Sequence, residues 1–267
     1  MRRTMIVAGL LALLVAASWR CARAETPSCC GERTPDANSV EAVLGELQER
    51  AAALTSYQCK LDYVVRQPLL ESQARRKGVL YYAKLENRSY LRIDFNTLQY
   101  DEEPEQAYRE QYLFDGVWLT YVNYEGRSVQ RQQMAEPNEP VDAFSLVSRR
   151  VPILGFSKIE DLQNQFEIEL IPLDEAAQAS FRHLRMNVRP ESIYRDDYVT
   201  IDFRIDRKQG LPAKVVAVTS EQDVHEIALI DGRVNQELGR GLFDLDIPRD
   251  FSVETIPLQR NVGRTSG

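Results

Sequence analysis

The sequence is poor in the residues that most often carry catalysis. Only two of its 267 residues are histidine, His183 and His225, and both fall in segments that read as strands. Their spacing is not that of metal ligands, and the sequence has neither a Gly-x-Ser-x-Gly elbow nor a glycine-rich phosphate loop. Acidic pairs such as Asp196-Asp197 are more typical of solvated turns. We therefore expect a protein with no enzymatic activity, no metal and no cofactor.

Basic residues are also in short supply. The chain has 33 Lys and Arg against 40 Asp and Glu, a net charge of −7. The first 24 residues hold four Arg and no acid, so the chain without them carries −11. Because an acidic surface repels polyanions, this charge argues against nucleic acid as a partner and disfavours anionic membrane surfaces.

Long apolar runs are absent except at the N-terminus, which reads MRRTMIVAGLLALLVAASWRCARA. Arg2 and Arg3 precede the apolar run and a small-x-small site at 22–24 follows it, which is the layout of a secretory signal peptide. The run is short for a membrane span. We predict residues 1–24 to be a signal peptide cleaved after Ala24. Retention as an anchor, or lipidation at Cys21, remains the alternative.

Cysteine is scarce, with three residues left after the signal: Cys29, Cys30 and Cys59. Export permits a disulfide, but the odd number leaves at least one thiol unpaired in a monomer. Two alternatives stay open. Cys59, in a predicted strand, either pairs with Cys29 or Cys30 of the tail or is a free buried thiol.

The pattern after the signal changes from tail to helix to strands. Residues 25–38 are polar and proline-rich, which predicts disorder. Apolar residues then recur at helical spacing from Val40 to Leu54, behind the capping candidates Asn38 and Ser39, which predicts an amphipathic helix. From Tyr57 the period becomes two, and strand patterns separated by turn residues continue towards the C-terminus.

The stretch LFDGVWLTYVNYEGRSVQ, residues 113–130, predicts two strands with a tight turn at Asp115-Gly116. The strand from Val117 to Tyr124 is apolar on both faces, so both faces need a cover. The apolar middle of the chain, broken by Pro140 and Pro152, predicts a helical insertion. We expect helices to lie over one face of the sheet, with any remaining space forming an apolar cavity.

These elements predict an α+β fold: a large curved antiparallel sheet with an N-terminal helix and a helical insertion gathered on one face. No βαβ rhythm and no internal repeat is present. We place the domain at 39–258, followed by a C-terminal tail at 259–267.

The order of motifs resembles the outer-membrane lipoprotein carrier family (LolA-like). The motifs are an amphipathic helix ending in LTSYQCKLDYVV, then GVLYYAKLENRSYLRIDF, then LFDGVWLTYVNYEGRSVQ, and finally FDLDIPRDFSVE. Together they span most of residues 40–256.

The resemblance implies an unclosed antiparallel β-barrel, lidded by helices, around a hydrophobic cavity. It implies a periplasmic, non-enzymatic and monomeric carrier of acylated lipoproteins or lipids, with an inner-membrane partner that loads it and an outer-membrane acceptor. Residues expected in the sheet walls are Tyr81, Leu91, Ile93, Trp118, Leu119 and Tyr121, although phase alone does not say which of them face the cavity. Residues expected in the lid are Val43, Leu47, Leu54, Phe144, Val147, Ile153, Leu154 and Phe156.

The chain departs from the family pattern in several places. The closing Phe-x-Phe-x-x-Pro reads FDLDIP at 243–248, the apolar middle is richer than a simple lid requires, and the basic residue expected near the lid is changed. Where the carriers have an arginine that helps to hold the lid, this sequence has Lys84 followed by Leu85. A lysine has a point charge without the bidentate fork of arginine. Lys84 is the expected basic contact to the lid.

The alternative function is an envelope lipid-sensing or protein-interaction module on the same fold, like the RseB-type regulators.

Overall fold

The computed structural model describes residues 39–86, 88–143 and 159–258. The chain separates into two units, 1–36 and 37–267, and all the described residues lie in the second. The helices and strands are α1 (Val40–Ala52), β1 (Ser56–Gln67), η2 (Pro68–Leu70), β2 (Ser72–Leu85), β3 (Arg88–Tyr100), β4 (Gln106–Phe114), β5 (Trp118–Asn123), β6 (Ser128–Gln133), α3 (Ile159–Gln165), β7 (Phe166–Ile171), α4 (Glu175–Ser180), β8 (Phe181–Val188), β9 (Tyr198–Asp206), β10 (Leu211–Thr219), β11 (Val224–Val234), η3 (Arg240–Phe243) and β12 (Ser252–Ile256).

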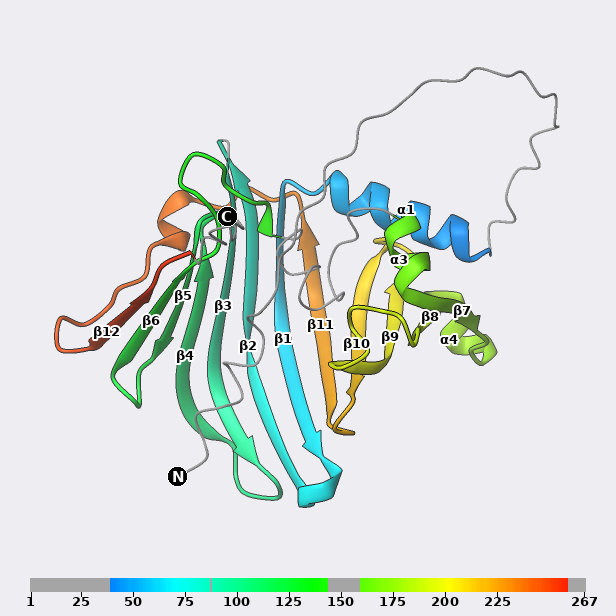
Figure 1. The fold of residues 1–267 in the computed structure, drawn as a ribbon, viewed down its shortest axis with the longest axis horizontal. Helices are drawn as coiled ribbons and strands as arrows, with labels where there is room; N and C mark the ends of the chain where they lie inside the picture. The colour runs from blue at the N-terminus through cyan, green and yellow to red at the C-terminus, as the bar shows by residue number, and fades with distance from the viewer. Residues whose placement is uncertain (1–38, 87, 144–158, 259–267) are drawn as a thin grey trace, which may run out of the picture. The chain divides into compact units, whose positions relative to one another are not determined.

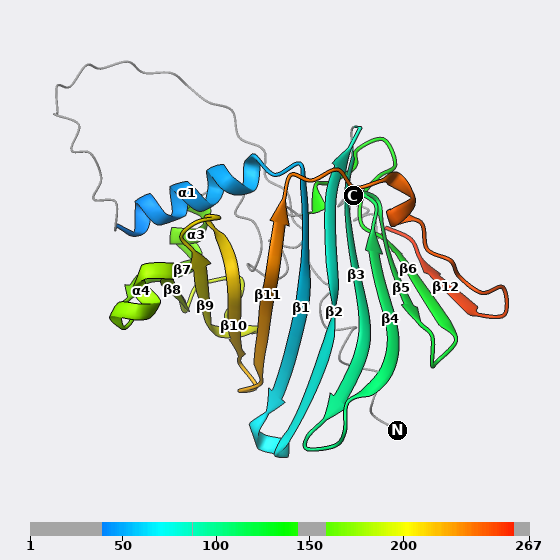
Figure 2. The ribbon, with the colours of Figure 1, turned by 180° about the vertical axis from the view of Figure 1, so that it is seen from behind.

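The strands form one unclosed 12-stranded sheet in the order β12-β6-β5-β4-β3-β2-β1-β11-β10-β9-β8-β7. Two meanders, β1 to β6 and β7 to β11, meet where β1 pairs with β11, as Figures 1 and 2 show. The predicted curved, mainly antiparallel sheet is confirmed. One pairing differs, because β12 adds to β6 in the parallel direction at the edge of the sheet.

Helix α1 forms where the sequence predicts it. Ser39 is the N-cap, and its hydroxyl oxygen accepts a hydrogen bond from the Ala42 backbone nitrogen at 3.2 Å. The stripe Val43, Leu44 and Leu47 is buried against the end of the sheet formed by β7 to β10. Both views place α1 beside β9 and β10 and away from β3 to β6 (Figures 1 and 2). We call the side of the sheet that α1 covers the inner face and the opposite side the outer face.

Two clusters of buried side chains lie on the inner face. The first joins α1 to residues of β7 to β10 such as Leu184 and Phe203. The second lies over β1 to β4, where Leu80, Tyr82 and Phe114 pack with Leu54, which follows α1. Burial at roughly 25 cal/mol per Å² of apolar surface makes these clusters the main source of stability.

The outer face of β2 to β6 is covered by the C-terminal segment 238–251, which we call the strap. Phe243 of η3 is buried there against Ala83 and Tyr90. Arg92 fastens the strap, because its Nη1 donates to the Leu242 carbonyl oxygen at 2.6 Å. Further along, the Tyr124 hydroxyl donates to the Asp246 carbonyl oxygen at 3.1 Å.

The outer face of β5 is apolar as well as the inner one, and it is largely buried. Val122 points outward and is fully buried, as is Val129, its partner on β6. The described helices α1 and α3 pack on the other half of the sheet. The C-terminal strap is thus a cover on the outer face of the sheet that the sequence did not suggest, and it reaches the end of β5 at Tyr124. The central part of the predicted helical insertion lies outside the described residues.

Glycine is required at two places in this sheet. Gly116 has φ +92° in the β4–β5 turn, where the Asp115 carboxylate accepts hydrogen bonds from the backbone nitrogens of Val117 and Trp118. At Gly78, a Cβ atom would lie 2.0 Å from the Asp94 carbonyl oxygen, because β2 and β3 approach closely at a bulge.

Candidate functional site

The register of β2 to β5 aligns inner-face side chains into three rows that grade from apolar to polar. Residues on neighbouring strands that pair by register share a face. The first row is Tyr82, Leu91, Phe114 and Leu119; the second is Leu80, Ile93, Tyr112 and Tyr121; the third is Gly78, Phe95, Glu110 and Asn123. We call them the inner-face rows.

The apolar part of these rows is incompletely buried. Leu91, Ile93, Tyr112 and Leu119 pack against the second core cluster, yet each stays half-buried. Their neighbours Leu80 and Phe114 are buried. The inner face of β3 to β5 therefore presents apolar side chains that are available for contact with a further apolar group.

The polar end of the rows centres on a buried ion pair. Glu110 is only 4% exposed, and its Oε2 lies 3.4 Å from Arg76 Nε. The Tyr112 hydroxyl donates to the other carboxylate oxygen at 2.5 Å. Such a pair is costly to desolvate and contributes little net stability. Because it nevertheless lies among aromatic rings, the Glu110–Arg76 pair is a candidate functional group.

Aromatic rings surround this ion pair. Tyr112 and Tyr121 stack with centroids 4.8 Å apart, and Phe95 meets the Tyr112 ring edge-on at 6.3 Å. Burial, with the charge of Glu110, raises the pKa of Tyr121 to about 12 and raises that of Tyr112 further. Both phenols are therefore neutral hydrogen-bond donors at physiological pH.

A histidine lies on the same face beside these rings. The Tyr63 hydroxyl and His225 Nδ1 are 2.7 Å apart, and the two rings stack with centroids separated by 6.0 Å. Burial lowers the pKa of His225, so the imidazole stays neutral at neutral pH. Sequence reasoning placed His225 in a strand but had no signal for this contact, because β1 and β11 are far apart in the chain.

The structure divides the predicted wall residues between the two faces. Leu91, Ile93, Leu119 and Tyr121 lie on the inner face. Tyr81 lies on the outer face, beside the strap. Trp118 is also on the outer face, where the Arg131 guanidinium lies 5.1 Å from its ring centroid.

The predicted lid residues also separate. Val43 and Leu47 are core residues over β7 to β10, whereas Leu54 packs over β1 to β4. Phe144, Val147, Ile153, Leu154 and Phe156 lie outside the described residues.

Lys84 contacts the end of α1. Its Nζ donates to the carbonyl oxygen of Ala52 at 3.3 Å, and its backbone nitrogen donates to the Thr55 carbonyl oxygen at 2.7 Å. A cation at a helix C-terminus complements the helix dipole. Lys84 therefore links β2 to the helix that covers the inner face.

Cys59 is buried on the inner face and forms no disulfide with another residue that the structure describes. Burial raises its pKa to about 12, so it is not a reactive thiolate. Cys29 and Cys30 lie outside the described residues, and pairing with them stays a prediction. Within the described ranges, no helix has the length and apolar content needed to cross a membrane.

No family model matches the chain, and its sequence matches no curated protein. Among solved structures, a conserved protein from Thermus thermophilus is similar at 10% identity and a TM-score of 0.47, covering 80% of this chain and 98% of that one. MucB of Pseudomonas aeruginosa, in complex with MucA, is similar at 12% identity and a TM-score of 0.44; the match covers 76% of this chain but only 60% of that one.

A LolA superfamily protein from Nitrosomonas europaea is also similar, at 11% identity and a TM-score of 0.32, covering 77% of this chain and 97% of that one. The family that the sequence motifs resemble is thus represented among the similar structures. Likeness at this level transfers no ligand, partner or site residue to this chain.

Proposed function

We propose that this chain is an exported, non-enzymatic protein that binds an acylated ligand on the inner face and carries it through the periplasm. The observation that supports the proposal is the apolar part of the inner-face rows, which the described residues leave half-buried. A protein that must keep acyl chains out of water needs such a surface.

The energetics favour an acylated ligand. Each CH₂ group moved from water to an apolar surface contributes about 0.8 kcal/mol, so a long acyl chain binds well along rows of Leu and Ile side chains. The Tyr and Glu–Arg groups at the polar end would supply hydrogen bonds for the head of such a ligand.

Helix α1 does not serve as a mobile lid in this proposal, because Val43, Leu44 and Leu47 are buried against β7 to β10 and hold the helix there. The hydrogen bond from Lys84 to Ala52 is exposed and contributes little to stability by itself. A ligand on the inner-face rows would lie beside the end of α1 that Lys84 contacts.

Binding can be tested with a tryptophan placed on the inner face. Trp118 lies on the outer face and should not sense the ligand. In the variant Trp118→Phe/Leu119→Trp, the new indole replaces a half-buried inner-face residue. Titration of the processed protein with a diacylated lipopeptide should give a saturable blue shift of its emission at one-to-one stoichiometry.

Two controls separate binding from non-specific effects. The processed wild type, with Trp118 alone, should show no shift, and the same peptide without acyl chains should leave the variant unchanged. In the wild type, Leu119→Gln should weaken lipopeptide binding, measured by calorimetry, about tenfold through the loss of apolar contact. A folded variant that binds no lipopeptide contradicts the proposal and favours the protein-interaction alternative.

A further inference from the structure

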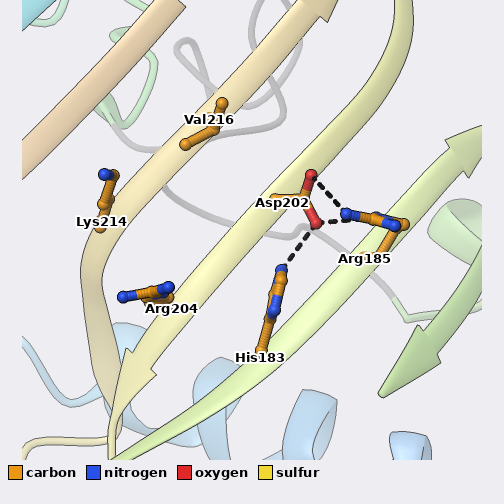
Figure 3. A pocket seen from close by; sticks show the side chains of 6 residues that line it. All are labelled: His183, Arg185, Asp202, Arg204, Lys214 and Val216. Atoms are coloured by element: carbon orange, nitrogen blue, oxygen red, sulfur yellow. Dashed lines mark hydrogen bonds and ion pairs between the residues drawn. The ribbon is translucent and has the colours of Figure 1, made fainter. Parts of the chain in front are cut away.

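A second site candidate lies on the outer face, on the half of the sheet away from the strap. It is a shallow hollow of about 160 Å³ on β8 to β10, shown in Figure 3. Its lining residues are His183, Arg185, Asp202, Arg204, Lys214 and Val216. The lining holds three permanent cations and one carboxylate, in a chain whose net charge is −7.

Strand register places three basic side chains in one row across this hollow. Lys214 on β10 pairs with Arg204 on β9, and Arg204 pairs in turn with His183 on β8. Figure 3 shows Arg204 between the other two. Like charges directly opposite each other on neighbouring strands are destabilising. The permanent charges of Arg204 and Lys214 therefore repel each other across the two strands, and a bound anion would relieve that repulsion.

The carboxylates nearby are already engaged with other cations of the site. Asp202 accepts from Arg185 Nε at 2.9 Å and lies 2.7 Å from His183 Nε2. Lys214 Nζ lies 2.6 Å from Glu226. Arg204 is exposed and has no ion pair or side-chain hydrogen bond among the residues that the structure describes. Its guanidinium is the group without a counter-charge.

We propose that this row binds a phosphoryl group, with Arg204 as its principal contact and Lys214 and His183 beside it. A guanidinium presents a planar fork of donors that matches the oxygens of phosphate. The hollow is open to solvent on the outer face, so either a soluble phosphate or a lipid headgroup can reach it. The site lies on the opposite face from the inner-face rows and does not depend on the function proposed for them.

The test uses the processed protein and the variant Arg204→Gln, with Lys60→Gln as the matched control. Lys60 is an exposed basic residue of the same face, on β1, and is paired with Asp231. Inorganic phosphate is titrated by calorimetry against sodium chloride of equal ionic strength. Binding to vesicles of phosphatidylglycerol in phosphatidylcholine is measured by flotation, against phosphatidylcholine alone.

For the probe that binds, inorganic phosphate or phosphatidylglycerol vesicles, we expect Arg204→Gln to weaken the affinity at least tenfold. Lys60→Gln should change that affinity less than twofold. Loss of phosphate binding in Arg204→Gln supports the site with a soluble phosphate as ligand; loss of vesicle binding supports it with a lipid headgroup. Binding to neither probe, or equal binding by Arg204→Gln, overturns the proposal.

Melting in phosphate-free buffer provides an independent readout. Because Arg204→Gln removes repulsion from the row, its melting temperature should equal or exceed that of the wild type. A clear decrease would mean that Arg204 serves the folded structure, and would also overturn the proposal.

Discussion

Side chains alternate between the two faces of the sheet along β5, so adjacent residues have different surroundings. Trp118 meets Arg131 on the outer face, whereas Leu119 joins the apolar inner-face row. The sequence identifies both as strand residues, but their phase relative to the rest of the sheet depends on pairing with β4 and β6. A single-residue shift would exchange the two environments.

His225 makes the stability of the protein depend on pH. Burial lowers the pKa of its imidazole, so the folded protein binds a proton less readily than the unfolded chain, whose histidine has a pKa of about 6.5. Unfolding therefore takes up a proton below that pH, and stability should fall as the pH drops from about 6.5 towards the lowered pKa. The free energy of unfolding, measured by urea denaturation, should be lower at pH 5.5 than at pH 7.5.

The variant His225→Gln isolates this contribution. Without the imidazole, its stability should change less between the same two pH values, while the difference between variant and wild type stays constant above pH 7.5. An equal loss of stability in both proteins on acidification would assign the effect to carboxylates and contradict the role of His225.

At the scale of elements, the strap is the segment whose position depends most on contacts with residues distant in the sequence. It lies far from β2 to β6 in the sequence, yet it covers their outer face and delivers β12 to the edge of the sheet. Its contacts combine a buried aromatic ring with hydrogen bonds from Arg92 and Tyr124 to its carbonyl oxygens. Because these acceptors are backbone atoms, the side chains of the strap give no sequence pattern that predicts these hydrogen bonds.

Truncation of the strap's anchor should destabilise the whole domain. Phe243 is 2% exposed, so Phe243→Ala leaves a cavity and should lower the free energy of unfolding by about 3 kcal/mol. Asp246→Ala, an exposed change in the same segment, should stay within about 0.5 kcal/mol of the wild type. Denaturation in urea compares the two; similar losses would show that the strap is not held at Phe243.

At the scale of the molecule, export is a prediction of the sequence that the described residues do not test. We expect the protein recovered from the cell envelope to begin at Glu25, because the small-x-small site ends at Ala24. Intact mass spectrometry distinguishes the outcomes. A mass that includes residues 1–24 indicates a retained anchor, and a mass beginning at Cys21 with added acyl chains indicates lipidation.

The two faces of the molecule would have separate tasks under the two proposals. The inner face offers apolar rows ending in a neutral cluster of tyrosines with a Glu–Arg pair, and the outer face of β8 to β10 offers unneutralised positive charge. An acyl chain and a phosphoryl group could therefore bind at once, on opposite sides of one sheet. Neither test depends on the outcome of the other.

The sequence by itself determined the local structure: the α1 helix, the turn at Asp115-Gly116 and the period-two strands. It offered Asn38 and Ser39 as caps, and the structure selects Ser39. Caps, turns and periodicity act over a few residues, so their signals are visible in the printed chain. The short helix α4 escaped prediction because six residues capped by Asp174 carry too little periodicity.

Only the tertiary structure decided which residues share a face. The inner-face rows, the strap on the outer face, the parallel addition of β12 and the row of Lys214, Arg204 and His183 all depend on the register between strands. Register is selected by burial of the whole sheet at once, through partners as distant in the chain as Tyr57 and Val234. No local pattern encodes that choice.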